Sequence, residues 1–272
     1  MSIPLKLRDW INPDKLDWNY LSLNPSEGAI ALLEQNPDKI CWTLLSQTPV
    51  AIRLLEQNTD KIDWVHLSKN PAAIGLLEQN PDNIDWTRLS FNPSERAIAL
   101  LEKNPAKIVW WSLSANPAAI ALLVQNPDKI DLELFSMNSA AMHILEKISP
   151  NKLNWLGLSE NPAAIRLLEQ NPDKINWRYL SINPTAIALL EQNPDKIDWF
   201  MLSDNPAAIA LLEKNPDKIV WHMFSKNPAI FVYDYAAMRA SRAGLNEEII
   251  RVAWHPRRVF SWIESGMDVD DL

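Results

Sequence analysis

A tryptophan that recurs about every 22 residues constrains this chain more than any other feature. Nine of the 13 Trp fall on one lattice, and Leu132 occupies the tenth position. Six of the nine steps between these positions are 22 residues, two are 24 and one is 23. The lattice consists of Trp18, Trp42, Trp64, Trp86, Trp110, Leu132, Trp155, Trp177, Trp199 and Trp221. A period in the range of roughly 20 to 50 residues is the signature of a repeat architecture. We therefore expect ten imperfect copies of one unit.

Each copy predicts two short helical segments that begin and end at Asn-Pro boundaries. In the third copy, Asn70 is a helix cap and Pro71 occupies the first helical position, where its missing N–H is not needed. Residues 72–79 form helix-favouring sequence that ends before Pro81, because the residue before a proline is pushed out of the α region. Asp85 then caps a shorter segment, either α or 3-10. Eighteen of the 20 Pro lie on these two boundaries, so proline here punctuates helices.

One such unit cannot bury its Ile, Leu and Trp alone, but stacked copies share a continuous core. The prediction is an all-α solenoid over residues 1–230, about 90 Å long at about 9 Å per layer. Residues 231–272 do not repeat. We expect helices over 234–242, from Asn246, and over 257–265 before Gly266, which together form a C-terminal capping segment.

The repeated columns have structural and functional interpretations. The Trp column is either an aromatic ladder for a sugar or Pro-rich ligand or a stacked core column, and Leu132 favours the core. Rows of Lys, Asp and Glu are either a track for cations or basic peptides or solvated ion pairs of small individual value. The residue before each lattice position is a helix cap, a role that Asn154 and Asn176 preserve and that Cys41, Val109 and Val220 lose.

Three variable columns flank the Trp column. They lie one and two residues after the lattice position and directly after the Leu-Ser pair that follows, and we call them the first, second and third variable columns. Their aromatic, basic and apolar residues suit a protein-binding face, although packing between units is an equal alternative. The candidates are Tyr20, His66, Arg88, Phe91, Trp111, Arg178, Tyr179, Ile182 and Phe200.

The C-terminal segment carries a second candidate contact. Its arginines could dock an acidic partner or a nucleic acid, and the acidic residues at the very end oppose such docking. The candidates are Arg242, Arg251, Arg257 and Arg258.

Composition argues against several functional classes. With 26 Lys+Arg against 34 Asp+Glu, the chain has a net charge of −8, which disfavours nucleic acid. The single cysteine, Cys41, excludes a disulfide framework and fits a reducing compartment. The four His fit no metal spacing, no nucleophile or phosphate-loop motif occurs, and only five Gly are present. We expect no enzyme, no cofactor, no metal and no membrane-spanning or secretory segment.

Two resemblances follow from the repeat itself. The alternation in Leu158-Ser159-Glu160-Asn161-Pro162 and Leu168-Glu169-Gln170-Asn171-Pro172-Asp173 resembles the leucine-rich variant repeat, which alternates α and 3-10 helices. The full unit NPAAIxLLEQNPDKIDWxxLSxNP and the tail from Asn246 to Arg258 are similar to tandem-repeat proteins of large DNA viruses. This second resemblance implies a viral source, in host cytoplasm or virion, and no known activity. Leu132, Thr48 and the stretch around Ser149-Pro150 depart from the pattern.

The leading functional hypothesis is a non-enzymatic scaffold that binds another protein through the variable columns. The alternative is a structural component of a viral or other macromolecular assembly. Nucleic-acid binding by the tail arginines is the least favoured possibility.

Overall fold

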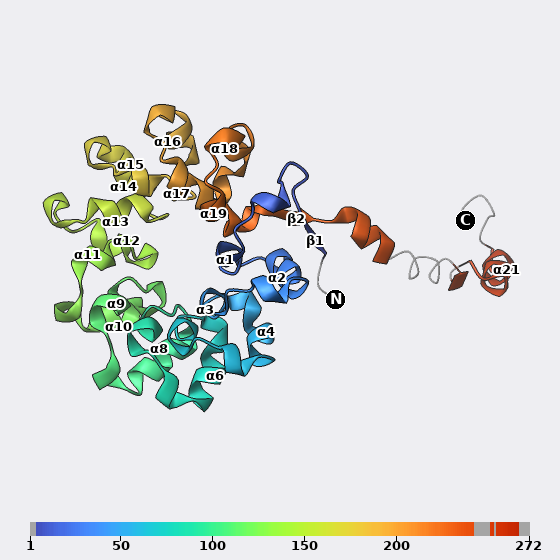
Figure 1. The fold of residues 1–272 in the computed structure, drawn as a ribbon, viewed down its shortest axis with the longest axis horizontal. Coiled ribbons are helices and arrows are strands. Elements are labelled where there is room, and N and C mark those ends of the chain that lie inside the picture. The colour runs from blue at the N-terminus through green and yellow to red at the C-terminus, as the bar shows by residue number, and fades with distance from the viewer. Residues whose placement is uncertain (1–3, 242–250, 253, 267–272) are drawn as a thin grey trace. The chain divides into compact units, whose positions relative to one another are not determined.

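The computed structural model describes residues 4–241, 251–252 and 254–266. Residues Leu7–Phe231 form one compact unit, and Met1–Lys6 with Val232–Leu272 form another. The part Leu7–Phe231 contains all ten repeats and is built from short α-helices and 3-10 turns, which confirms the predicted all-α repeat architecture. Its repeats are arranged as a ring (Figure 1).

Two sets of α-helices alternate along the repeats, and we call them inner and outer because in Figure 1 α1, α17 and α19 lie nearer the centre of the ring than α2, α16 and α18. The inner helices are α1 (Trp18–Leu21), α3 (Trp42–Leu45), α5 (Trp64–Leu67), α7 (Trp86–Ser90), α9 (Trp110–Ser114), α11 (Leu132–Phe135), α13 (Trp155–Glu160), α15 (Trp177–Leu180), α17 (Trp199–Asp204) and α19 (Trp221–Ser225). The outer helices are α2 (Glu27–Glu34), α4 (Ile52–Glu56), α6 (Ile74–Gln79), α8 (Glu95–Glu102), α10 (Ile120–Gln125), α12 (Met142–Leu145), α14 (Ile165–Gln170), α16 (Ile187–Glu191) and α18 (Ile209–Glu213). We number the units one to ten by their inner helices.

The 3-10 turns occupy the Pro-containing boundaries. One set precedes the inner helices: Pro13–Lys15, Pro37–Lys39, Thr59–Lys61, Pro81–Asn83, Pro105–Lys107, Pro127–Lys129, Pro150–Lys152, Pro172–Lys174, Pro194–Lys196 and Pro216–Lys218. A second set follows the inner helices: Pro49–Ala51, Pro71–Ala73, Pro117–Ala119, Ser139–Ala141, Pro206–Ala208 and Pro228–Ile230. The predicted helix over 72–79 is thus a 3-10 turn that passes into α6 at Ile74.

Side-chain caps explain where the inner helices begin. The Asp85 carboxylate accepts a 2.7 Å hydrogen bond from the Arg88 backbone N–H, at the third position of α7. Asn154 and Asn176 cap their helices in the same way, whereas Cys41, Val109 and Val220 make no side-chain cap. The predicted capping column is therefore confirmed, including its three gaps.

Neighbouring units are joined by a buried ladder of serine and asparagine side chains. The Ser46 hydroxyl donates to the Trp42 carbonyl and accepts from the Asp63 N–H of the next unit. The Asn70 side-chain amide donates to the carbonyls of Ser46 and Thr48 in the preceding unit. Nine units carry this asparagine, each donating to two carbonyls, while the tenth carries Thr48, which makes one such bond to the Ser22 carbonyl.

The same ladder joins the last unit to the first. The Asn24 side-chain amide donates to the carbonyls of Ser225 and Asn227 at 2.9 and 3.0 Å. The Asp17 N–H donates to the Ser225 hydroxyl at 2.8 Å, as the equivalent residue does in each of the other interfaces. The ten repeats therefore close into a ring with ten interfaces of one kind. The predicted open solenoid of about 90 Å is corrected accordingly.

The hydrophobic core lies between the inner and outer helices. In the third unit, Leu67, Ala73 and Leu77 have no more than 1% of their surface exposed. Phe135 and Phe224 take the place of Leu67 in two other units and are equally buried. Buried Ser and Asn side chains accompany this apolar core; those of the ladder are hydrogen-bonded, whereas the buried Ser112 hydroxyl has no partner. Each layer thus combines apolar burial with directional polar bonds that fix its stacking.

The two ends of the repeat array are fastened by extra contacts. The Arg8 N–H and side chain donate to the carbonyls of Ile230 and Ala229 at 3.0 and 2.7 Å. The tenth unit has no outer α-helix, and its Phe231 ring instead packs on Gly28 of α2. β1 (Leu5–Leu7) pairs with β2 (Phe231–Tyr233) in a two-stranded sheet.

Residues after the ring contain the expected helical segments where they are described. Residues 235–241 are helical, and α21 spans Pro256–Glu264, followed by Gly266 with φ of 95°. Asn246 lies outside the described residues. The capping prediction for 231–272 assumed exposed terminal layers; in the ring, the first and tenth units cover one another. The capping role itself stays a prediction.

Candidate binding surface on the inner wall of the ring

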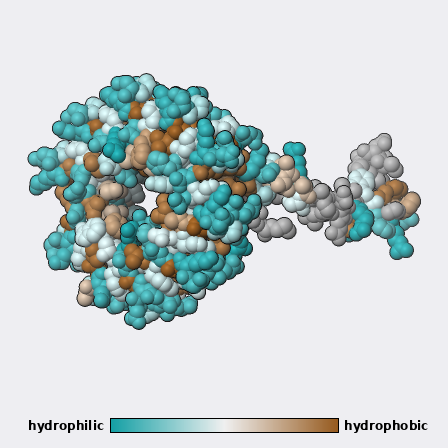
Figure 2. Space-filling view, viewed as in Figure 1, coloured by the Kyte–Doolittle hydropathy of each residue, from teal (hydrophilic) through white to brown (hydrophobic). Residues whose placement is uncertain are grey.

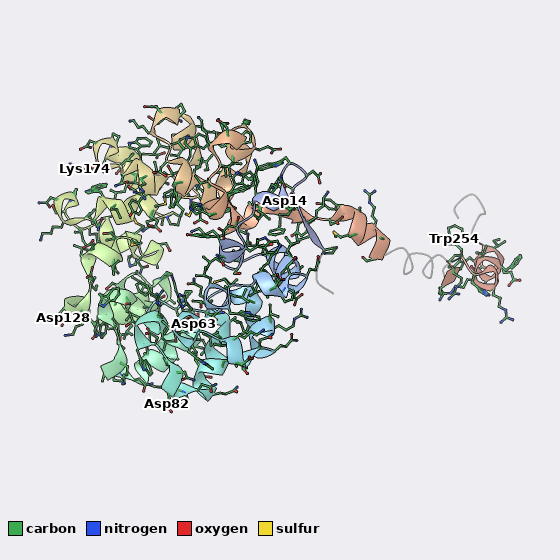
Figure 3. All side chains as sticks on the ribbon, in the orientation of Figure 1. Asp14, Asp63, Asp82, Asp128, Lys174 and Trp254 are labelled. Atoms are coloured by element: carbon green, nitrogen blue, oxygen red, sulfur yellow. The ribbon has the colours of Figure 1, made fainter. Side chains whose placement is uncertain are left out.

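The variable columns lie on the inner helices and directly after them. Asp63, which begins α5, lies nearer the centre of the ring than Asp82, Asp128 and Lys174 of the preceding turns, which lie at its edge (Figure 3). Inner helices of successive units contact one another, including α17 with α19 and α19 with α1. In the space-filling view the ring is hollowed at its centre, with apolar and polar residues at the border (Figure 2). We call this surface the inner wall.

The Trp column is only partly buried, so it is not the fully buried core column that the repeat predicts. The Lys39 ammonium lies 4.2 Å from the centre of the Trp18 ring in the preceding unit. The same contact recurs at the seam, where Lys15 lies 5.0 Å from the Trp221 ring. A cation over a partly exposed indole contributes about 0.5–1 kcal/mol. At five of the ten interfaces the repeated Lys and Trp therefore form one inter-unit contact.

Ring closure brings together aromatic residues from opposite ends of the repeat array. The His222 ring lies 5.1 Å from Tyr20 and 5.5 Å from Phe200, measured between ring centres. Phe200 nevertheless keeps 39% of its surface exposed. Two of the predicted binding residues, 180 positions apart in the sequence, thus belong to one aromatic cluster, and His222 joins them.

A second aromatic contact lies beside two cations. The Phe91 and Trp111 rings meet edge to face, with centres 5.6 Å apart, and Trp111 is 48% exposed. The Lys69 ammonium lies 5.8 Å from the centre of the Phe91 ring. Surrounding protein atoms lower the pKa of Lys69, and the positive charge of Arg88 lowers it further. We call Lys69, Arg88, Phe91 and Trp111 the basic arc.

Two carboxylates approach each other on another part of the inner wall. Burial raises the pKa of Glu160, the negative charge of Asp204 raises it further, and Lys226 opposes this shift. Burial also raises the pKa of Asp204, although its carboxylate lies 2.6 Å from the Lys226 ammonium. These residues, which we call the acidic arc, come from units seven, nine and ten. All three residues belong to the third variable column.

The remaining predicted residues lie on α5, on α15 or directly after α15, and they do not form a single cluster. The His66 Nδ1 atom lies 3.0 Å from the Asp63 carboxylate. Burial alone would raise the pKa of Asp63, but the hydrogen bond from the His66 backbone N–H and the adjacent His66 imidazole hold it below its ordinary value. Arg178 is 3.8 Å from Asp198, and Tyr179 and Ile182 are half-buried.

The tail candidates are described only in part. Arg251, Arg257 and Arg258 are exposed, and Arg242 lies outside the described residues. Phe260, which is 66% exposed, lies on α21 together with Arg257 and Arg258.

The sequence did not single out His222, Glu160, Asp204 or Lys226 as binding candidates. Their columns were recognised as variable, but an open solenoid keeps units seven to ten away from unit one. Only the curvature of the ring brings Tyr20 to His222 and Glu160 toward Asp204.

Searches for other kinds of site are negative within the described part of the chain. No group of three or more His, Cys, Asp or Glu residues there is arranged to hold a metal ion. None of the helices described is both long and apolar enough to cross a bilayer. Comparison with protein-family models, curated proteins and solved structures finds no match to this chain.

Proposed function

We propose that the ring is a non-enzymatic scaffold that binds a segment of another protein along its inner wall. The observation that carries the proposal is the position of the variable columns. They lie on the concave side of a closed ring, with Trp111 and Phe200 still 48% and 39% exposed. Large aromatic residues in a concave surface are the usual anchors of protein interfaces.

The residues of the ladder hold the ring together, whereas the residues of the variable columns are available to a partner. Serine and asparagine residues that join the units are buried and bonded, so they are unavailable to a partner. Residues at the variable positions differ from unit to unit, so a partner lying against the wall meets a different side chain at each step. A repeat scaffold gains specificity in this way without changing its fold.

Recovery of partners from an extract of cells that make the protein tests the proposal. The double variant Tyr179→Ala/Phe200→Ala should lose the partner that the unaltered ring retains. Val124→Ala is the matched control, because Val124 is 53% exposed but lies on the outer helix α10. Equal recovery by all three proteins, each with an unchanged circular dichroism spectrum, contradicts the proposal.

A second candidate function is a structural role in a viral or other assembly. It is favoured by the exposed apolar side chains of α21, among them Phe260 and Ile263 at 66% and 38%. Absence of the protein from purified particles of its source contradicts this role.

A further inference from the structure

The basic arc contains two cations without an acidic partner. Lys69 and Arg88 come from adjacent units, and burial, followed by the positive charge of Arg88, lowers the pKa of Lys69. Throughout the described residues, no ion pair joins either cation to a carboxylate. The Asp85 carboxylate, which lies on the same helix as Arg88, accepts from its backbone N–H. A negative charge supplied from outside would relieve the repulsion between the two cations.

The neighbouring aromatic pair adds a second element of recognition. Phe91 and Trp111 lie edge to face, and the exposed part of Trp111 leaves an apolar surface open. Lys69 lies beside Phe91, so the cations and the apolar surface are adjacent. This combination fits a ligand that presents an anionic group next to an apolar one.

We propose that the basic arc binds an acidic segment of another protein, with a carboxylate at Lys69 and Arg88 and an apolar side chain against Phe91 and Trp111. The inference rests on the proposed function and adds the chemistry of the partner. A carboxylate accepts charge-assisted hydrogen bonds from both cations, and the Arg guanidinium donates two of them in a bidentate geometry.

Charge elsewhere on the inner wall favours a polypeptide over a nucleic acid. Glu160 and Asp204 of the acidic arc share only one cation, Lys226, within the ring. A polyanion along the wall would meet this uncompensated negative charge, and the whole chain carries −8. A protein segment places its acidic residues at one point and other residues elsewhere, so it avoids the repulsion.

A randomised synthetic peptide library is the probe that tests this inference. Ten-residue peptides retained by the full-length protein are sequenced and compared with the input. Photoreactive groups introduced at position 111 or 200 of the protein report whether the retained peptides lie on the inner wall. We expect enrichment of Asp or Glu beside an aromatic or aliphatic residue. In Lys69→Met/Arg88→Met, binding of an enriched peptide should weaken about tenfold, because both charge-assisted contacts are lost.

A matched control separates local recognition from net charge. Arg53→Met/Lys103→Met removes two positive charges at the outer helices α4 and α8, so it should leave binding unchanged. Equal weakening in both double variants overturns the inference. Peptides that cross-link to the inner wall without acidic enrichment overturn it while leaving the proposed function standing. Failure of any peptide to bind the wall counts against both. Binding of a single-stranded oligonucleotide that depends on Lys69 overturns it in favour of a nucleic acid.

Discussion

The Asn24 side-chain amide donates a 2.9 Å hydrogen bond to the backbone carbonyl of Ser225, 201 residues later in the chain. The same bond between neighbouring units spans about two dozen residues, as between Asn92 and Ser68. A local stacking bond has thus become one of three ladder bonds that join the two ends of the repeat array. Closure therefore depends on the same chemistry as the repeat.

Removing the Asn24 amide should weaken the seam substantially. Asn24→Ala removes both inter-unit hydrogen bonds to the buried carbonyls of Ser225 and Asn227, which costs about 2–4 kcal/mol of unfolding free energy. Urea denaturation measures this loss. Asn36→Ala is the control: its half-buried amide donates to one carbonyl, Leu32, so it should cost about 1 kcal/mol. Equal losses in the two variants would show that the seam is not held by the ladder.

Completing the ladder should stabilise the ring. The Thr48 hydroxyl donates one hydrogen bond, to the Ser22 carbonyl. We expect the side-chain amide of an asparagine at this position to reach the carbonyl of Asn24 as well. Thr48→Asn should raise the unfolding free energy by about 1 kcal/mol. The reverse change in an intact interface, Asn116→Thr, should lower it by a similar amount, because one of its two inter-unit bonds is lost. Urea titrations of both variants check these opposite signs.

Two glycines should respond in opposite ways to alanine. A Cβ at Gly28 meets the Phe231 ring at 2.5 Å, so Gly28→Ala displaces the side chain that replaces the tenth outer helix. Overpacking of this kind costs about 1–3 kcal/mol. A Cβ at Gly75 in α6 meets nothing within 4 Å, so Gly75→Ala should stabilise by about 0.5–1 kcal/mol. Thermal unfolding distinguishes them, and a stabilised Gly28→Ala would contradict the packing at the seam.

The acidic arc should make stability depend on pH. A carboxyl with a raised folded-state pKa binds more protons when folded, so its ionisation destabilises the ring as pH rises through the interval between the unfolded and folded values. The ordinary pKa of a glutamate carboxyl is 4.5. Glu160→Gln should therefore stabilise the protein at pH 7 and have little effect near pH 3. Urea denaturation of the variant and the unaltered protein at pH 7 and pH 3 tests this prediction. A gain in stability at pH 3 alone would contradict it.

The sequence was sufficient to predict the unit but not its closure. Asp85 and its equivalents predict where the inner helices begin, and the sequence also predicts that Val109 and Val220 make no side-chain cap. Closure depends on a small rotation between units that accumulates over ten steps, which no single residue specifies. The one local signal is Gly28, which stands where other units carry Ala72 or Arg96, because Phe231 needs the space. The basic and acidic arcs follow from curvature, so spacing alone did not reveal them.

Closure also bears on how such a chain can change over generations. An open repeat array lengthens by duplication or shortens by deletion, because each new unit finds a free end. Here ten equivalent interfaces already complete a full turn, so each unit accounts for a tenth of a circle. An eleventh unit has no place to stack, and the loss of one leaves a gap wider than Asn24 can span. The number of repeats is therefore fixed by geometry, and inherited variation is confined to substitutions within a constant count.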